Sequence, residues 1–263
     1  MATVSRPQTP SVGDERFFLR SAIIMAAIIA IGFSIQLAMG RSTFASPVRV
    51  HFHAILFMGW VALYLTQNVL VAIDRVDLHR RLGWVAAVWM VPMAVSGFLV
   101  TAIMVRSGTV PFFFQPLHFL VFDPLTVTGF AVLTIAAVIL RRRTEWHRRL
   151  HFCGMTLLLA PAFGRLLPLP LLQPWAWEST VLVTLLFPSA GVWADLRRGG
   201  RVHRAWAWGL GTIVAVFALT QMITYGPAGT ALYDAVTEGT PGANVPPLEY
   251  PPPPAGPLMT GRS

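Results

Sequence analysis

The chain has 263 residues, of which 55% are hydrophobic and only 12% charged, and its mean hydropathy is +0.61. A soluble domain carries about 25% charged residues, so this composition excludes a soluble globular protein and indicates an all-α, polytopic membrane protein. All 20 basic residues are arginines. Without lysine the chain can form no retinal or pyridoxal Schiff base, so a rhodopsin is excluded.

The formal charge of +9 is carried by arginines between apolar segments. This placement reflects membrane topology, and no nucleic-acid partner is expected. Cys153 is the single cysteine and lies in an apolar segment, which excludes a disulfide framework and a cysteine-cluster metal site. The seven histidines are therefore the richest source of chemistry.

Seven apolar blocks are each about the 20 residues needed to cross a bilayer core of about 30 Å. The expected spans are about 17–39, 50–73, 80–105, 117–140, 148–167, 177–195 and 205–225. Kinks are expected at Pro92, Pro161 and Pro188. Residues 1–16 read as a polar tail before a retained anchor, and the proline-rich residues 226–263 as an extended or disordered tail.

The arginines predict an orientation. The joints after spans 2, 4 and 6 hold Arg75, Arg80, Arg81, Arg141, Arg142, Arg143, Arg148, Arg149, Arg197, Arg198, Arg201 and Arg204. The opposite joints hold only Arg41, Arg49, Arg106 and Arg165. By the positive-inside rule the first set is cytoplasmic, so the N-terminus lies inside and the C-terminus outside a membrane, expected to be a bacterial cytoplasmic membrane.

The histidines form an internal repeat. His51-Phe52 and His79-Arg80-Arg81-Leu82 open spans 2 and 3, and His118-Phe119 and His147-Arg148-Arg149-Leu150 open spans 4 and 5. The two units, about 47–105 and 115–167, predict a four-helix bundle of spans 2–5 with an outer and an inner histidine layer. Imidazoles that face each other inside a dry helical bundle can serve as the axial ligands of one or two b-type haems. Interfacial histidines that cap helices would produce the same pattern.

Helical phase distinguishes His51 from His53, which lie about 200° apart around one helix. The face of His53 continues through Phe57, Trp60 and Tyr64, whereas the face of His51 is aliphatic. We therefore expect His53 to face the bundle, although aromatic packing alone would explain the same stripe.

Asp123 lies inside an apolar span, where a carboxylate is costly and by default marks a functional site. Arg165 is at a similar depth and is its expected partner, or the partner of a haem propionate. A purely structural Asp–Arg pair, or a carboxylate that caps a helix restarted at Pro124, is the alternative.

The inner side also permits a non-haem metal site. Glu145, His147 and His151 follow a Glu-x-His-x-x-x-His pattern. The further inner candidates are Asp74, Asp77, His79, Asp195 and His203. Such a set of ligands would suit a membrane metal oxygenase.

The histidine pattern resembles the transmembrane two-haem cytochromes b that act as ascorbate-dependent or ferric reductases. It is also similar to haem A synthase and to bacterial membrane families with an H-R-x-L-G signature, here His79-Arg80-Arg81-Leu82-Gly83. Over residues 47–167 the resemblance implies ligation by His53 (or His51) with His118, and by His79 with His147 (or His151).

The preferred hypothesis is a membrane b-type cytochrome, an oxidoreductase that carries electrons between a quinol or small reductant and an acceptor. The alternatives are a non-enzymatic scaffold, assembly factor or small-solute carrier with interfacial histidines, and the metal oxygenase. Departures from the resembling families are the seventh span, the absence of lysine and His151 after the second motif. They leave the electron donor and acceptor open.

Overall fold

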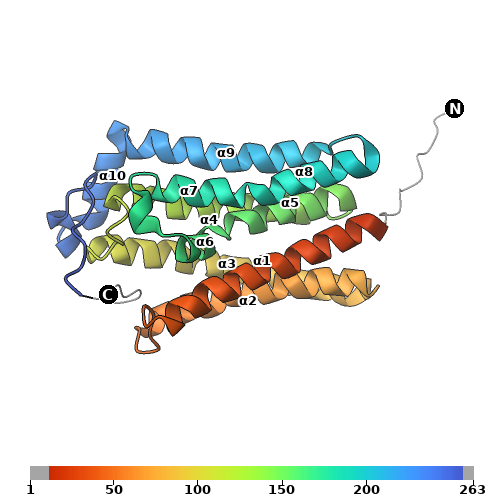
Figure 1. Cartoon of the computed structure of the whole chain (residues 1–263), viewed down its shortest axis with the longest axis horizontal. Helices are drawn as coiled ribbons and strands as arrows, with labels where there is room; N and C mark the ends of the chain where they lie inside the picture. The colour runs from red at the N-terminus through yellow and green to blue at the C-terminus, as the bar shows by residue number, and fades with distance from the viewer. Residues whose placement is uncertain (1–11, 257–263) are drawn as a thin grey trace.

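The computed structural model describes residues 12–256, which form helices and no strand. Its elements are α1 (Val12–Ala38), α2 (Val48–Ala72), α3 (Val76–Arg106), α4 (Pro116–Ile139), α5 (Thr144–Leu157), α6 (Ala160–Leu166), η1 (Leu169–Leu172), α7 (Ala176–Thr184), α8 (Leu186–Gly199), α9 (Arg204–Thr224), α10 (Pro227–Thr237) and η2 (Pro241–Asn244). Figure 1 shows an elongated bundle. The arginine end carries the α2–α3, α4–α5 and α8–α9 joints, and the opposite tail end carries α10.

Six helical stretches in residues 12–256 are long and apolar enough to cross a membrane: α1, α2, α3, α4, α7 with α8, and α9. The bundle is therefore that of an integral membrane protein, but the expected count of seven spans is not confirmed. The fifth expected span, 148–167, is instead divided into α5 and α6, of 14 and 7 residues.

Proline chemistry accounts for the two breaks. Pro161 has no N–H to donate to the carbonyl of Leu157, and the chain tightens there through a bond from Leu158 N to Met155 O of 3.1 Å. Pro188 likewise leaves the carbonyl of Thr184 without a helical donor, and α7 ends at that residue. By contrast, α3 and α4 continue through Pro92 and Pro124.

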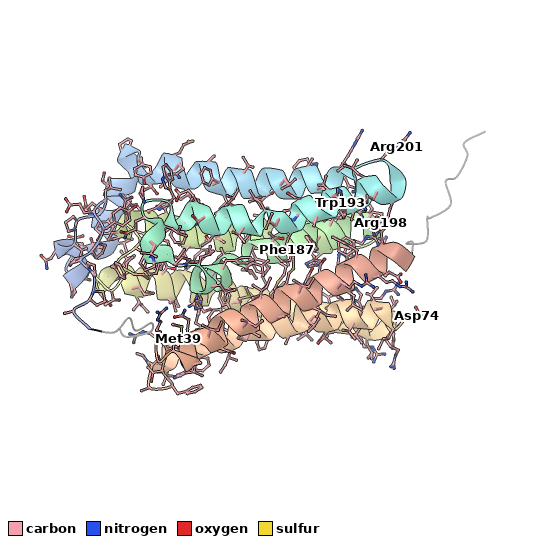
Figure 2. The ribbon with its side chains drawn as sticks, in the orientation of Figure 1. Met39, Asp74, Phe187, Trp193, Arg198 and Arg201 are labelled. Atoms are coloured by element: carbon pink, nitrogen blue, oxygen red, sulfur yellow. The ribbon has the colours of Figure 1, made fainter. Side chains whose placement is uncertain are left out.

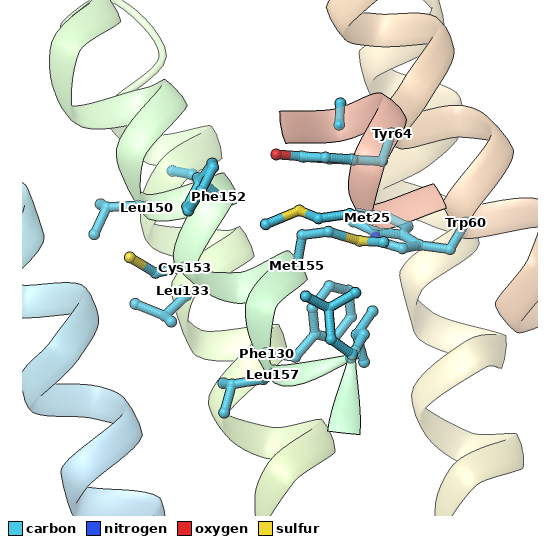
Figure 3. Packing of buried hydrophobic residues seen from close by; sticks show 14 of the residues in the cluster. Met25, Trp60, Tyr64, Phe130, Leu133, Leu150, Phe152, Cys153, Met155 and Leu157 are labelled. Atoms are coloured by element: carbon cyan, nitrogen blue, oxygen red, sulfur yellow. The ribbon is translucent and has the colours of Figure 1, made fainter. Parts of the chain in front are cut away.

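The core is not confined to a four-helix bundle of spans 2–5. Trp60 and Tyr64 of α2 pack with Met25 of α1, Phe130 of α4 and Phe152 of α5, and Figure 3 shows this packing from close by. The Trp60 and Phe130 rings meet edge to face with centroids 4.9 Å apart. Burial of these side chains ties α1 to the repeated units, which is why α1 is part of the core and not a detached anchor.

Small residues allow the closest approaches between helices. Gly191 of α8 lies under the Trp206 ring of α9, where an added Cβ would stand 2.1 Å from the nearest ring carbon. Gly209 of α9 packs on the buried thiol of Cys153, at 2.3 Å from such a Cβ to the sulfur. These contacts hold α9 against α5 and α8 by van der Waals packing, as is usual between membrane helices.

Residues 226–256 differ from the expected extended or disordered tail. They form α10 and η2 and then fold over the tail end, where Leu117 N donates to Pro247 O at 2.9 Å. Gln115 Nε2 donates to Leu248 O at 2.6 Å, and the Tyr233 hydroxyl lies 3.1 Å from the carbonyls of Gly242 and Val245. Hydrogen bonds from the start of α4 and from α10 thus hold the residues after α10 in place, although the proline-rich composition had predicted an extended or disordered tail.

Candidate functional site: a histidine cluster at the arginine end

The two repeated His-Arg-Arg-Leu motifs bring their histidines together. His79 opens α3 and His147 opens α5, and their ring centroids lie 6.1 Å apart with perpendicular planes. His151 is one turn further along α5, with its ring centroid 4.8 Å from that of His147. The expected inner layer, in which His79 meets His147 and His151, therefore has close contacts in the structure.

The hydrogen bonds of this cluster leave ring nitrogens available. His147 Nδ1 lies 2.9 Å from the carbonyl of Ala137, which can only accept, so Nδ1 carries the proton and Nε2 is left unprotonated in the neutral ring. Among the residues that the structure describes, neither the buried His79 Nδ1 nor the buried side-chain oxygen of Gln67 on α2 has a hydrogen-bond partner. Unsatisfied buried groups are uncommon, and two of them border this cluster.

The glycines near the cluster differ in their surroundings. A Cβ added to Gly83, one turn after His79, would meet only Gln67 Nε2, at 3.5 Å. A Cβ added to Gly154 would touch Thr134 and the backbone of Phe130 on α4. Gly83 therefore leaves space beside His79, whereas Gly154 serves the packing of α5 on α4.

The acidic residues expected to complete a non-haem metal site lie elsewhere. Glu145 binds Arg148 and Arg149, Asp77 lies 3.8 Å from Arg75, and His203 caps α9 by accepting from Ala205 N. Within residues 12–256 no group of three or more His, Cys, Asp or Glu side chains is arranged to hold a metal ion. The structure therefore gives the oxygenase hypothesis no ligand set.

A buried ion network lies beside the histidine cluster and was not predicted from the sequence. Arg149 is 4% exposed and donates to Asp195 of α8 from Nε and Nη2, at 3.1 and 2.6 Å. Asp195 also accepts from Trp206 Nε1 at 2.8 Å and from His203 N at 3.2 Å. In the same network Arg148 binds Asp14, to which Arg198 is also paired at 2.5 Å, so α1, α5, α8 and α9 are joined at the arginine end.

Figure 2 labels Arg198 and Arg201 at this end of the molecule and Met39 at the other.

The two arginine pairs of the repeat have different environments. Arg148 and Arg149 are held inside the network, whereas Arg80 and Arg81 are exposed. Burial, followed by the charge of Arg149, lowers the pKa of His203 below its ordinary value of 6.5.

The expected outer pair is not brought together. His53 lies against α3, 3.5 Å from Ser96 Oγ and with its ring 4.3 Å from that of Phe57, whereas His51 Nε2 is 3.1 Å from Phe44 O. The inward face assigned to His53 thus agrees with its contacts. His118 packs elsewhere, against residues of α4 and α7 and against Tyr225, which follows α9. Within residues 12–256 no ring contact joins it to His53.

The surroundings of His118 are aromatic. Its ring centroid lies 5.0 Å from that of Trp177, 5.4 Å from Phe122 and 6.2 Å from Tyr225. The residue is 6% exposed, and its Nε2 has no hydrogen-bond partner in the described part of the chain. A cavity of about 20 Å³ touches Trp177 and is lined by residues of α4, α5, α6, α7 and α9, among them Thr126 and Thr184, which is room for one water.

Asp123 and Arg165 interact electrostatically but do not form an ion pair within 4 Å. Asp123 instead accepts a short hydrogen bond from Thr101 of α3. Arg165 donates to Pro161 O at 2.7 Å and stacks on Phe33, with its guanidinium carbon 3.9 Å from the ring centroid. The expected direct pair is therefore replaced by two separate anchors at similar depth.

These sites were compared with known proteins. No family model, no curated protein and no solved structure matches the chain.

Proposed function

We propose that the chain is a membrane b-type cytochrome that holds one haem between His79 and His147. The observation that carries the proposal is the contact of the two repeated motifs, with ring centroids 6.1 Å apart. Two imidazoles that each bind one metal ion from opposite sides, at about 2.0–2.1 Å from metal to nitrogen, have centroids about 6 Å apart. His151 is the alternative partner, because its ring adjoins that of His147.

The residues around the pair suit this role. The Ala137 carbonyl orients the His147 ring and makes Nε2 the donor nitrogen, a common arrangement for metal-binding histidines. His79 contributes a buried nitrogen that has no other partner, and Gly83 leaves space one turn away. The Arg149–Asp195 pair holds α5 in place two residues after His147. When bound, a b-type haem supplies one-electron transfer, with a potential set by its axial ligands and their hydrogen bonds.

In this proposal the cytochrome passes electrons between a quinol or small reductant and an acceptor at the membrane surface. The proposal includes one haem because His53 and His118 have different neighbours, on α3 and on α7 with α9. The arginine end would face the cytoplasm, by the positive-inside rule.

The test is the absorption spectrum of the full chain, purified in detergent after expression with added haem precursor. We expect a Soret band and, after reduction, the sharp α band of a low-spin bis-imidazole haem. His79→Ala and His147→Ala should each remove it. His203→Ala is the matched control at the same end and should keep it, as should His118→Phe. A purified protein without a Soret band despite the added haem precursor would contradict the proposal. So would a His203→Ala variant that loses the band as completely as the His79 and His147 variants.

A second candidate is a non-enzymatic scaffold or assembly factor. It is favoured by the ion network around Asp195 and by the closely packed aromatic rings around His118, because both give rigidity without requiring a cofactor. Metal analysis of the purified protein distinguishes the candidates. A cytochrome contains about one iron per chain, and a scaffold contains none.

A further inference from the structure

A second group of arginines lies at the same end as the histidine cluster and takes no part in the ion network. This α3–α5 arginine patch consists of Arg80, Arg81, Arg141, Arg142 and Arg143, all exposed. Arg80 and Arg81 follow His79, and the other three directly precede α5, which carries His147. The Arg141 guanidinium lies over the ring of Trp84, one helical turn after Arg80, so the two arginine runs lie near each other.

Within residues 12–256 the positive charge of the patch is not neutralised, because no carboxylate oxygen lies within 4 Å of any of its guanidinium nitrogens. The nearby acids have other partners, since Glu145 binds Arg148 and Arg149, and Asp77 pairs with Arg75. The five guanidinium groups of the patch are therefore available to bind an anion, and each can bind phosphate oxygens in a bidentate manner.

The surface next to the patch is apolar and exposed. Trp84 is 60% exposed, and the Arg141 guanidinium lies over its ring at 5.6 Å. Val85 and Val88 continue this face of α3 with exposures of 51% and 71%. An arginine stacked on a tryptophan at the end of a membrane helix lies at headgroup level, and the valines face acyl chains. A soluble anion would use only the charge, whereas a phospholipid would use both surfaces.

We propose that the α3–α5 arginine patch is a binding site for an anionic phospholipid that carries two phosphates. The five cationic groups exceed what one phosphate can neutralise, and they lie at the ends of two membrane helices, α3 and α4, where such headgroups bind in membrane proteins. The proposal is independent of the haem, since it uses the exposed α3–α5 arginine patch and not the rings of His79 and His147.

The experiment measures binding of tail-labelled tetraoleoyl cardiolipin to the full chain in neutral detergent micelles. Arg142→Gln/Arg143→Gln removes two patch charges, and Arg201→Gln/Arg204→Gln removes two exposed charges where α8 is joined to α9, at the same end. Each arginine near an anionic headgroup contributes about 1 kcal/mol, or about fivefold in affinity, so the patch variant should bind at least roughly tenfold more weakly. The control variant should bind within about twofold of the wild type.

Three outcomes would overturn the proposal. Equal weakening in both double variants would show a general effect of net charge. Equally tight binding of phosphatidylglycerol at matched total charge would show that two linked phosphates are not recognised. Binding of inorganic pyrophosphate without binding of the lipid would make the site one for a soluble anion. Unfolding temperatures in lipid-free neutral detergent should be equal for the three proteins, so that a loss of binding is not a loss of fold.

Discussion

The buried pair of Arg149 and Asp195 offers the sharpest test of what holds the arginine end together. Asp195→Asn removes the charge but retains an acceptor oxygen for Trp206 and for the His203 backbone. Breaking a buried ion pair by changing one partner costs about 3–5 kcal/mol. Arg149 keeps its contact with Glu145, so we expect a loss of about 2–3 kcal/mol in the free energy of unfolding.

At about 2–4 °C per kcal/mol for a chain of this size, the melting temperature should fall by about 4–12 °C. The assay is unfolding in neutral detergent followed by tryptophan fluorescence, which reports directly on Trp206. The matched control is Asp77→Asn, because Asp77 and Arg75 form an exposed pair with side chains 61% and 56% accessible. Such a pair contributes about 0–1 kcal/mol, so its loss should hardly move the transition.

A second variant separates the charge from the packing. Arg149→Met with Asp195→Asn removes both charges and keeps the acceptor oxygen for Trp206 and His203 N. We expect it to be more stable than Asp195→Asn alone, because Arg149 is then not left buried with only part of its countercharge. An unchanged melting temperature for Asp195→Asn, or a double variant less stable than the single one, would refute the reasoning.

Two further predictions concern the α8–α9 region. Gly191→Ala should lower the melting temperature by several degrees, because its Cβ would stand 2.1 Å from the Trp206 ring, at a cost of about 1–3 kcal/mol, while Gly211→Ala, with nothing within 4 Å, should be neutral or stabilising. Equal melting temperatures for these two variants would contradict the packing argument. Burial lowers the pKa of His203 in the folded chain, so as the pH falls below about 6.5 this histidine binds a proton more readily in the unfolded chain than in the folded one. The free energy of unfolding therefore decreases as the pH falls. His203→Asn should keep the helix cap and lose less stability than the wild type between pH 7.5 and 5.5; parallel pH profiles would count against this role.

Local sequence predicted those features that depend on one segment at a time. Hydropathy located the six stretches long enough to cross a membrane, but it also predicted a span at 148–167 that the structure divides into α5 and α6, and it missed α10. The missing N–H groups of Pro161 and Pro188 coincide with the two breaks. Local rules did not distinguish these prolines from Pro92 and Pro124, through which α3 and α4 continue. Neighbouring helices decide whether a proline ends a membrane helix or is accommodated within it.

Sequence spacing predicted the proximity of histidines in one layer only. A motif repeated after one crossing and a turn returns to the same end of the bundle, so the approach of His79 to His147 could be inferred from spacing. His118 could not be assigned this way, because its neighbours Trp177 and Tyr225 come from helices outside the repeat. The ion network was missed for a similar reason. Arg149 and Asp195 are 46 residues apart in the sequence, and Arg81, which matches Arg149 in the repeat, is exposed.

The single thiol has a practical consequence for determining which end of the molecule faces which compartment. Cys153 is fully buried where α5 meets α9, with Gly209 against its sulfur. Burial at a helix interface shields it from a charged maleimide added to intact cells, so the wild-type protein provides a background free of labelling. A cysteine introduced at Arg201, at the arginine end, or at Asp234 on α10, at the tail end, would then be modified only from the side that it faces.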